Sequence, residues 1–248
     1  MLHMTKEMCV RHLSGTYVTY LSERVPTGID GLDPLIEGGF LRGDVILVVG
    51  RSGSGKTIFS TQFIYNGAVQ HDEKGVYASF EEDAKTLKRN MLNFGFDLER
   101  LEQKGMIKII DLEGLKGEGL SANIDYILEA LKEINGKRLV IDSLTAFLYG
   151  CAEKFEYRMF MHLMYRMLKM HGYTTLMTCS VPTGIDTLGL GVEEFVADSL
   201  IFLENVIDGL ELKTRFIIRK MRGTDHSRKY HNVIVTDKGL QILPFTVT

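Results

Sequence analysis

The sequence predicts an α/β fold with a mostly parallel central sheet, helices on both of its faces, and a C-terminal antiparallel hairpin extension. The first observation is that nearly continuous apolar runs, typical of strands buried on both faces, alternate with segments of helical periodicity. The expected strands are 45–49, 75–80, 106–111, 138–142, 174–179 and 199–204, and the expected helices are 85–94, 122–134 and 155–170. The second observation is that the strand-like runs 211–221, 231–235 and 240–243 have no helix between them. We expect these last runs to extend one edge of the sheet.

Length and composition fit one such domain preceded by a short extension. The chain has 248 residues, of which 45% are hydrophobic and 25% charged, and these proportions are ordinary for a globular protein. We assign residues 1–24 to an N-terminal extension and residues 25–248 to the domain. At the start of the domain, Thr27 and Asp30 match a capping box and predict a short helix that reaches Ile36.

Charge and cysteine content disfavour several classes of protein. The net charge of −3 gives no overall attraction to nucleic acid or to an anionic membrane, although a local basic patch stays open. The cysteines Cys9, Cys151 and Cys179 lack the spacing of a disulfide framework or a zinc site. No apolar run approaches the length of a membrane span, and Lys6 and Glu7 stand where a signal peptide needs an apolar core. We therefore expect a cytoplasmic protein without membrane contact.

The residues after the first parallel strand form a phosphate-binding loop. Residues 50–57 fit the pattern G-x-x-x-x-G-K-[ST] and lie between the apolar run 45–49 and the helix-compatible stretch 58–64. The glycines let successive backbone N–H groups surround an anion at a helix N-terminus. Lys56 would reach the β- and γ-phosphates, and the Thr57 hydroxyl would ligate Mg²⁺. The motif predicts a nucleoside triphosphate site with contacts from Ser52, Gly53, Ser54, Gly55, Lys56, Thr57 and Ile58.

Three acids at the carboxyl ends of predicted strands are candidates for hydrolytic chemistry. Asp142 ends the strand 138–142, where an aspartate of a phosphate-loop fold holds the hydration shell of Mg²⁺. The alternative is that Asp142 caps the following segment. Glu81 and Glu82 follow the strand 75–80, at the crevice where open α/β sheets bind ligands. Either carboxylate could orient an attacking water or accept its proton, and the alternative is helix capping.

A basic run lies in the predicted hairpin region. Its members are Arg215, Arg219, Lys220, Arg222, Arg228 and Lys229, with His226 among them. The residues alone leave three interpretations open: a solvated hairpin face, contact with a nucleic-acid backbone, and stabilisation of phosphate charge across a subunit boundary, as an arginine finger does. No aromatic stacking platform interleaves with the run, which weakens the nucleic-acid interpretation.

The predicted helix 155–170 is rich in methionine and apolar on more than one face. This pattern favours a helix enclosed between the core and a subunit contact. The alternative is an adaptable binding surface, because methionine side chains are flexible and polarizable.

Taken in order, these motifs resemble the KaiC-like branch of the RecA-like ATPases over about residues 25–244. The matching segments are 27–33 (TGIDGLD), 38–40 (GGF), the phosphate loop, 79–82 (SFEE), 93–98 (NFGFDL), 140–143 (VIDS), 191–198 (GVEEFVAD), 220–226 (KMRGTDH) and 235–239 (VTDKG). Several of these segments are longer than generic ATPase motifs, so the resemblance is specific.

The resemblance implies an ATPase that uses ATP and Mg²⁺ and forms a ring, usually a homo-hexamer, with ATP held between subunits. It implies that Gly53 to Thr57 and Asn93 contact ATP from one side, with Asp142 near Mg²⁺. It makes Glu81 and Glu82 the catalytic glutamate pair. The implied contacts to the neighbouring subunit's nucleotide are Lys220, Met221, Arg222, Thr224, His226, Thr236 and Asp237.

The sequence also departs from the tandem clock proteins of that branch. Those proteins carry two such domains, whereas this chain has one, and residues 180–187 lack the Ser-Thr doublet that is autophosphorylated in the second domain. We expect a homo-oligomeric ATPase that hydrolyses ATP to ADP and phosphate and couples its nucleotide state to a protein partner. The alternatives are a non-hydrolysing ATP-sensing module and a recombinase-like, nucleic-acid-associated ATPase.

Overall fold

The computed structural model of the chain describes residues 23–112, 120–148, 154–181 and 196–243. Most of the extension predicted for residues 1–24 lies outside these ranges. So do Cys9, Cys151, residues 182–187 of the loop discussed above, and residues 191–195 of one matching segment.

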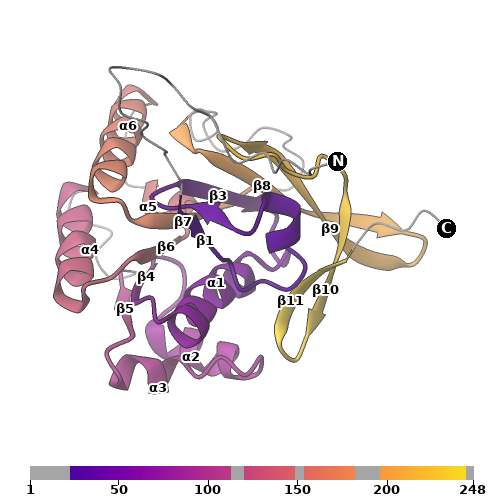
Figure 1. Ribbon diagram of the computed structural model, residues 1–248, viewed down its shortest axis with the longest axis horizontal. Helices are drawn as coiled ribbons and strands as arrows, with labels where there is room; N and C mark the ends of the chain where they lie inside the picture. The colour runs from indigo at the N-terminus through magenta and orange to yellow at the C-terminus, as the bar shows by residue number, and fades with distance from the viewer. Residues whose placement is uncertain (1–22, 113–119, 149–153, 182–195, 244–248) are drawn as a thin grey trace, which may run out of the picture.

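The described residues form one large sheet whose strand order is β11-β10-β9-β8-β3-β7-β6-β4-β5 (Figure 1). Its strands are β3 (Val45–Gly50), β4 (Gly75–Ser79), β5 (Ile107–Asp111), β6 (Arg138–Asp142), β7 (Thr174–Ser180), β8 (Ser199–Asp208), β9 (Glu211–Met221), β10 (His231–Thr236) and β11 (Gly239–Leu243). The strands from β8 to β5 run parallel, and β9, β10 and β11 continue the sheet antiparallel. The predicted fold class, including its C-terminal antiparallel extension, is confirmed.

Helices cover both faces of the parallel strands. They are α1 (Lys56–His71), α2 (Ala84–Leu92), α3 (Leu98–Gln103), α4 (Leu120–Ile134), α5 (Leu144–Leu148) and α6 (Lys154–His171). Successive side chains of a strand point to opposite faces, and β3 shows the result. Val45, Leu47 and Val49 pack in the cluster that includes α4 and α6, whereas Ile46 and Val48 pack in the cluster that includes α1. Figure 1 accordingly places α4 beside α6, and α1 beside α2.

The predicted capping box at Thr27 is wrong. The short helix is a 3₁₀ turn, η1 (Asp33–Ile36), and it begins three residues beyond Asp30. The Thr27 hydroxyl donates to Asp33 Oδ1 at 2.6 Å and accepts the N–H of Ile29 at 3.1 Å. These bonds form a local turn of the kind that threonine hydroxyls stabilise. Because the hydroxyl is used in this turn, it does not cap a helix. The same region contributes a small two-stranded sheet, β1 (Arg24–Val25) and β2 (Phe40–Leu41).

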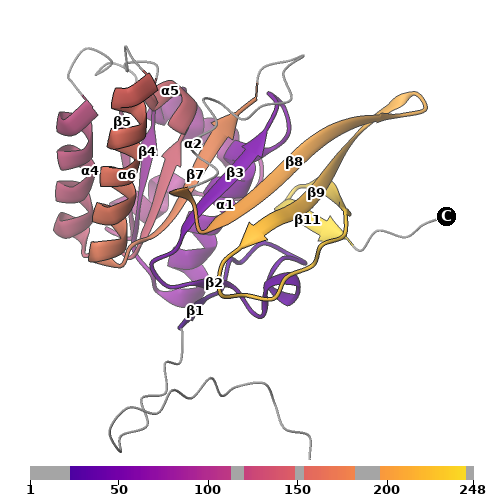
Figure 2. The same cartoon turned by 90° about the horizontal axis from the view of Figure 1, so that it is seen from above.

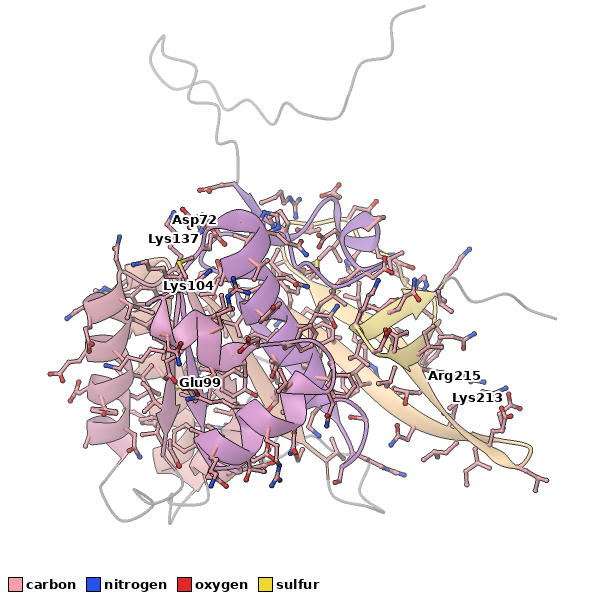
Figure 3. The ribbon with its side chains drawn as sticks, turned by 90° about the horizontal axis from the view of Figure 1, so that it is seen from below. Asp72, Glu99, Lys104, Lys137, Lys213 and Arg215 are labelled. Atoms are coloured by element: carbon pink, nitrogen blue, oxygen red, sulfur yellow. The ribbon has the colours of Figure 1, made fainter. Side chains whose placement is uncertain are left out.

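The hairpin of β8 and β9 projects well beyond the helical layers (Figure 2). Ile207, Leu210 and Leu212 at its tip are strongly exposed. Lys213 and Arg215 lie along the projection (Figure 3), and Lys213 pairs with Asp208 at 2.8 Å. At least part of the basic character of this hairpin is therefore balanced within the hairpin itself.

Helix α6 buries one face and exposes another. Met161, Met164 and Leu168 are buried against the sheet, whereas Met159 and Met170 are largely exposed. Within the described part of the single chain, α6 is therefore covered on one face only and is not enclosed on several sides. Within the described ranges, no helix is long and apolar enough to cross a membrane.

Candidate nucleotide-binding site

The phosphate loop connects the end of β3 to the start of α1, as the motif predicts. Gly55 takes the N-cap position of α1 with φ 92°, and Gly53 has φ 75°. These left-handed conformations strain any residue with a Cβ, so the two glycines allow the loop to turn its backbone N–H groups toward one point. A Cβ added to Gly53 would meet no atom within 4 Å, so this side of the loop is open.

Two side chains of the loop suit an anion. The Ser54 hydroxyl is buried and has no hydrogen-bond partner among the described residues. Lys56 donates from Nζ to the carbonyl oxygens of Gly50 and Arg51 at 3.0 and 3.1 Å. An orphaned buried hydroxyl and a buried ammonium group, next to a helix N-terminus, fit a phosphate ligand. Thr57 and Ile58 occupy the first turn of α1, and Ser52 is exposed at the loop tip.

The charge of Lys56 is opposed by burial and supported by nearby acids. Burial lowers the pKa of Lys56, while the carboxylates of Asp142 and Glu81 act in the opposite direction. These carboxylates are thus close enough to the ammonium group to affect it. An added phosphate would supply further negative charge and favour the protonated lysine.

Asp142 lies at the same edge of the sheet as the phosphate loop and is 6% exposed. The Tyr77 hydroxyl donates to its Oδ2 at 2.6 Å, and the Thr178 hydroxyl donates to its Oδ1. Two hydroxyl donors keep the carboxylate oriented, and each oxygen retains further acceptor capacity. The capping role is taken by Ser143 instead, whose Oγ accepts the N–H of Ala146 at 3.1 Å.

Glu81 and Glu82 directly follow β4 and are held by different partners. The Ser143 hydroxyl donates to Glu81 Oε1, whereas Asn90 Nδ2 donates to Glu82 Oε1 at 2.6 Å. Burial raises the pKa of Glu82, although the Asn90 hydrogen bond opposes this effect. Neither glutamate caps α2, because Asp83 accepts the N–H of Thr86 at 2.9 Å as its N-cap.

Asn93 lies at the C-cap of α2 and is exposed. Its backbone N–H bonds to the carbonyl oxygen of Asn90, the residue that also holds Glu82. Asn93, the predicted ATP contact, thus lies at the C-terminal end of α2, whereas Glu81 and Glu82 lie just before its N-terminal end.

Lys220, Met221 and Arg222 lie at the opposite edge of the sheet from the phosphate loop of the same chain. Met221 pairs with Ser199 in β8, and Ser199 pairs with Ile46 in β3. Gly50, where the phosphate loop begins, is four residues farther along β3, or about 13 Å at the usual rise of a strand. The structure does not bring these three residues to their own chain's phosphate loop.

The partners of this group differ from residue to residue. Lys220 Nζ donates to the carbonyl oxygen of Ala197 at 2.6 Å, and Arg222 Nη1 lies 3.5 Å from Asp198 Oδ1. Met221 is buried, so a nucleotide contact from this residue would come from its backbone.

Thr224 and His226 follow the same group. The Thr224 hydroxyl accepts a hydrogen bond from Arg24 Nη1 at 2.7 Å, and the residue is 9% exposed. Its carbonyl oxygen lies 3.3 Å from His226 Nδ1. The Thr224 hydroxyl is therefore engaged inside its own chain.

Thr236 and Asp237 lie apart from the Lys220 group. Thr236 ends β10 and Asp237 lies in the turn to β11, where the Thr236 hydroxyl donates to the carbonyl oxygen of Gly239. Leu240, which follows Gly239 in β11, is hydrogen-bonded to Gln62 of α1. Its N–H donates to Gln62 Oε1 at 2.8 Å, and its carbonyl oxygen accepts from Gln62 Nε2 at 3.2 Å. A Cβ on Gly55 would lie 3.4 Å from Leu240 Cδ2. The turn is thus placed beside the phosphate loop of its own chain.

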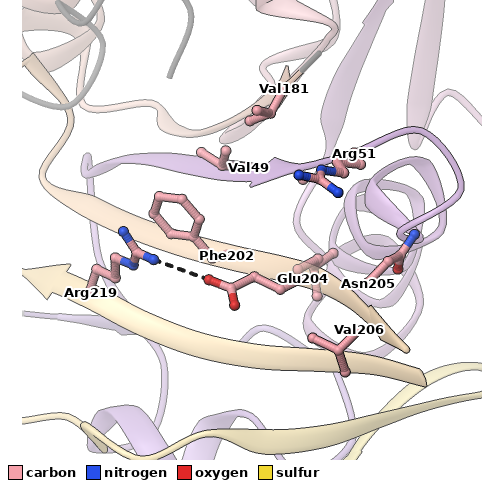
Figure 4. A pocket seen from close by; sticks show the side chains of 10 residues that line it. Val49, Arg51, Val181, Phe202, Glu204, Asn205, Val206 and Arg219 are labelled. Atoms are coloured by element: carbon pink, nitrogen blue, oxygen red, sulfur yellow. Dashed lines mark hydrogen bonds and ion pairs between the residues drawn. The ribbon is translucent and has the colours of Figure 1, made fainter. Parts of the chain in front are cut away.

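A cavity of about 410 Å³ lies beside Arg51, on the β8 side of the phosphate loop (Figure 4). Arg219 lines this cavity, pairs with Glu204 at 3.1 Å, and has its Cζ 4.0 Å from the ring centroid of Phe202. This arginine is engaged by its own hairpin, which supports the solvated-face interpretation for this member of the basic run.

Four residues of the site were missed by the sequence reasoning. Ser143, Tyr77 and Thr178 orient the acids, and Gln62 holds the C-terminal extension. A usable signal existed for Thr178 and Tyr77, because each places a hydroxyl within a strand that is otherwise buried. Polar groups buried in this way need hydrogen-bond partners, and the nearest acids were the candidates.

Comparison with known proteins identifies the family and the fold. A model of the KaiC ATPase family matches residues 25–247. The chain belongs to the KaiC family. Among solved structures, a KaiC-like protein from the hyperthermophilic archaeon Pyrococcus horikoshii has a TM-score of 0.83 and 38% identity, covering 90% of this chain and 100% of that protein. The fold is therefore the RecA-like fold of the KaiC family, in a single domain.

Two relatives show how this family member compares in length. The circadian clock oscillator protein KaiC of Synechococcus elongatus is 36% identical over 89% of this chain, but the match covers 44% of the clock protein. The chain thus spans less than half the length of that relative. A UPF0273 protein of Pyrococcus horikoshii is 35% identical over 90% of this chain and 95% of its own length.

Proposed function

We propose that this KaiC-family protein hydrolyses ATP to ADP and phosphate in the cytoplasm, as a homo-oligomeric ring whose active sites lie between neighbouring subunits. A hexamer is the ring size that the resemblance implies. Membership of an ATPase family and the geometry of the phosphate loop support ATP as the substrate.

In this proposal one subunit binds the triphosphate through the phosphate loop. The backbone N–H groups of residues 53–57 and the Ser54 hydroxyl donate to phosphate oxygens. Lys56 leaves its two carbonyl partners and neutralises the β- and γ-phosphates. Thr57 and Asp142 are the residues that would hold Mg²⁺, which neutralises phosphate charge when it is bound.

The glutamate pair acts on the attacking water. Glu81 is held by Ser143 beside Asp142 and orients the water for in-line attack on the γ-phosphate. Glu82, whose pKa is raised by burial, is suited to accept its proton.

The placement of Lys220 and Arg222 is the observation that carries the subunit-interface part of the proposal. Both lie at the edge of the sheet that is opposite to their own phosphate loop. Contacts from them to a nucleotide therefore require a second copy of the chain, arranged head to tail as in a ring. Met221, Thr224 and His226 belong to the same side of the interface.

Thr236 and Asp237 take a different role from the one the resemblance first suggested. Their turn is attached to α1 through Leu240 and Gln62. We therefore assign them, with Asn93, to the nucleotide of their own subunit.

One combined experiment tests this function. Light scattering with and without ATP and Mg²⁺ gives the particle mass, and phosphate release is measured in the same samples. The expected result is a multimer with turnover, and Arg222→Ala should lower turnover while leaving ATP bound. A multimer that follows ATP without releasing phosphate would favour the sensing module instead. Steeply salt-dependent binding of single-stranded DNA would favour the recombinase-like alternative.

A further inference from the structure

Asp198 lies at the amino-terminal edge of the sheet, directly before β8, and is 4% exposed. Its Oδ2 accepts the N–H of Val45 at 3.0 Å. Its backbone carbonyl accepts the N–H of Arg222 at 3.1 Å, and its Oδ1 lies 3.5 Å from Arg222 Nη1. Burial opposes the charge of Asp198, but hydrogen bonds, led by that from Val45, outweigh burial and lower its pKa. Asp198 thus contacts Arg222 both through its backbone carbonyl and through its charged carboxylate.

The residue before Asp198 contacts the other candidate cation. Lys220 Nζ donates to the carbonyl oxygen of Ala197 at 2.6 Å. Two consecutive residues therefore contact both of the cations that we assign to the neighbouring subunit's nucleotide.

Helix α6 supplies two further donors to the same carboxylate. The Tyr165 hydroxyl donates to Asp198 Oδ1 at 2.8 Å. Lys169 Nζ lies 3.0 Å from Asp198 Oδ2 and 3.0 Å from Asp44 Oδ1. Two carboxylates, those of Asp44 and Asp198, thus face Lys169, and Asp198 also faces Arg222. Asp198 is therefore in contact with α6 on one side and with Arg222 on the other.

We propose that Asp198 is a positioning residue that holds Arg222 in the direction in which it meets the neighbouring subunit's nucleotide, and that it ties this direction to helix α6. The inference rests on the proposed function, because it requires Arg222 to act in the neighbour's site.

The physical reason is the entropy of a long side chain. The Arg222 side chain is 52% exposed, so without an anchor it would sample many rotamers and would have to be ordered whenever nucleotide binds. A guanidinium group carries five N–H donors. A contact with Asp198 at one nitrogen is therefore compatible with contacts between other nitrogens and a phosphate.

The test compares Asp198→Asn, Arg222→Ala and the double variant in the assembled protein. The readouts are kcat and KM for ATP, calorimetric affinity for a non-hydrolysable ATP analogue, and particle mass. Asp198→Asn should lower kcat about tenfold, because a misplaced charged group loses its alignment, and it should weaken analogue binding at unchanged mass. In the Arg222→Ala background it should change neither quantity further, because two residues that act through one interaction are not additive.

A matched control is Asp208→Asn, which changes the same residue type at the other end of β8. Asp208 is exposed and pairs with Lys213 at the hairpin tip, so kcat and analogue affinity should stay unchanged.

The outcomes separate the inference from the proposed function. If the effects of Asp198→Asn and Arg222→Ala multiply, Asp198 has a structural role only and the inference is wrong. If Arg222→Ala alone changes neither kcat nor analogue affinity, the assignment of Arg222 to the neighbour's site is wrong.

Tyr165→Phe keeps the inference testable if Asp198→Asn does not fold. This variant removes one donor but retains the carboxylate and its pairing with Lys169. It should lower kcat about threefold, the effect of one lost hydrogen bond, and only when Arg222 is present. An unchanged kcat would contradict the positioning role.

Discussion

The Ser143 hydroxyl donates a hydrogen bond to Glu81, the first carboxylate of the candidate catalytic pair. Ser143 directly follows Asp142 in the chain, so this bond links the two acids. The same oxygen accepts the N–H of Ala146 at the start of α5. The acid assigned to the metal and the acid assigned to the water are thus fixed relative to each other by one small side chain.

Replacing both glutamates should separate binding from turnover. Glu81→Gln with Glu82→Gln should lower phosphate release at least about a hundredfold, because the amides cannot accept a proton. ATP affinity, measured by calorimetry, should be preserved. Ser143→Ala should give a smaller decrease, since it removes the hydrogen bond that orients Glu81. Undiminished phosphate release from the double variant would overturn the glutamate assignment.

Lys56→Ala should abolish measurable ATP binding. The ammonium group contacts the carbonyl oxygens of the loop, and its loss removes the cation that the loop itself provides for the β- and γ-phosphates. The matched control is Lys85→Ala, which removes an exposed lysine in α2 and should leave affinity unchanged. Equal binding by both variants would argue against the phosphate-loop interpretation.

Removal of Mg²⁺ by a chelator should stop phosphate release, and re-addition should restore it. Asp142→Asn should raise the Mg²⁺ concentration for half-maximal turnover about tenfold, because a neutral amide replaces the carboxylate that would hold the cation. Phosphate release across a magnesium titration measures this. An unchanged magnesium requirement would favour a structural role for Asp142.

Glu73 and Arg138 form a buried ion pair near the amino-terminal ends of β4 and β6. We expect this pair to contribute strongly to the free energy of unfolding. Arg138 is fully buried, and its Nε lies 2.7 Å from Glu73 Oε2. Glu73→Gln should lower the free energy of unfolding by about 3–5 kcal/mol, because it leaves a buried charge uncompensated. Urea denaturation measures this, and Asp208→Asn at the exposed pair should change it little.

The pH dependence of the same pair follows from the pKa of Glu73. Burial opposes its charge, but hydrogen bonds from Arg42 and Arg138 outweigh burial and lower the pKa. The carboxylate therefore stabilises the fold above the ordinary glutamate pKa, and this stabilisation is lost as the pH falls through the lowered value. Glu73→Gln should flatten the acid limb of the stability curve. A variant with an unchanged acid limb would contradict the assignment.

Most parallel strands were predictable because they read as nearly continuous apolar runs between turn signals, and the strands of the C-terminal extension were predictable as strand-like runs with no helix between them. The expected strand 138–142 matches β6 (Arg138–Asp142), and 211–221 matches β9 (Glu211–Met221). The helices α3 and α5 were missed because each spans six residues or fewer, too short for a periodic pattern to emerge.

The candidate site was predictable only in part. The phosphate loop and the acids after β4 and β6 follow from local motifs, since parallel strands bring their carboxyl ends to one edge. The contacts of Asp198 with Tyr165 and Arg222 join segments that are distant in sequence. Likewise, the placement of Thr236 depends on how β11 packs on α1. No local pattern encodes such contacts.

The hydrogen bonds between Gln62 and Leu240 also bear on the order in which the chain folds. They join residues separated by 178 positions, and Asp30 contacts Gln241 across 211 positions. Contacts of such long range slow folding, because closing a long loop costs entropy before the contacts repay it. During synthesis, Gln62 of α1 can form these hydrogen bonds only after β11 has been made. A nascent chain that stops short of this strand would contain the whole phosphate-loop motif without the setting that supports it.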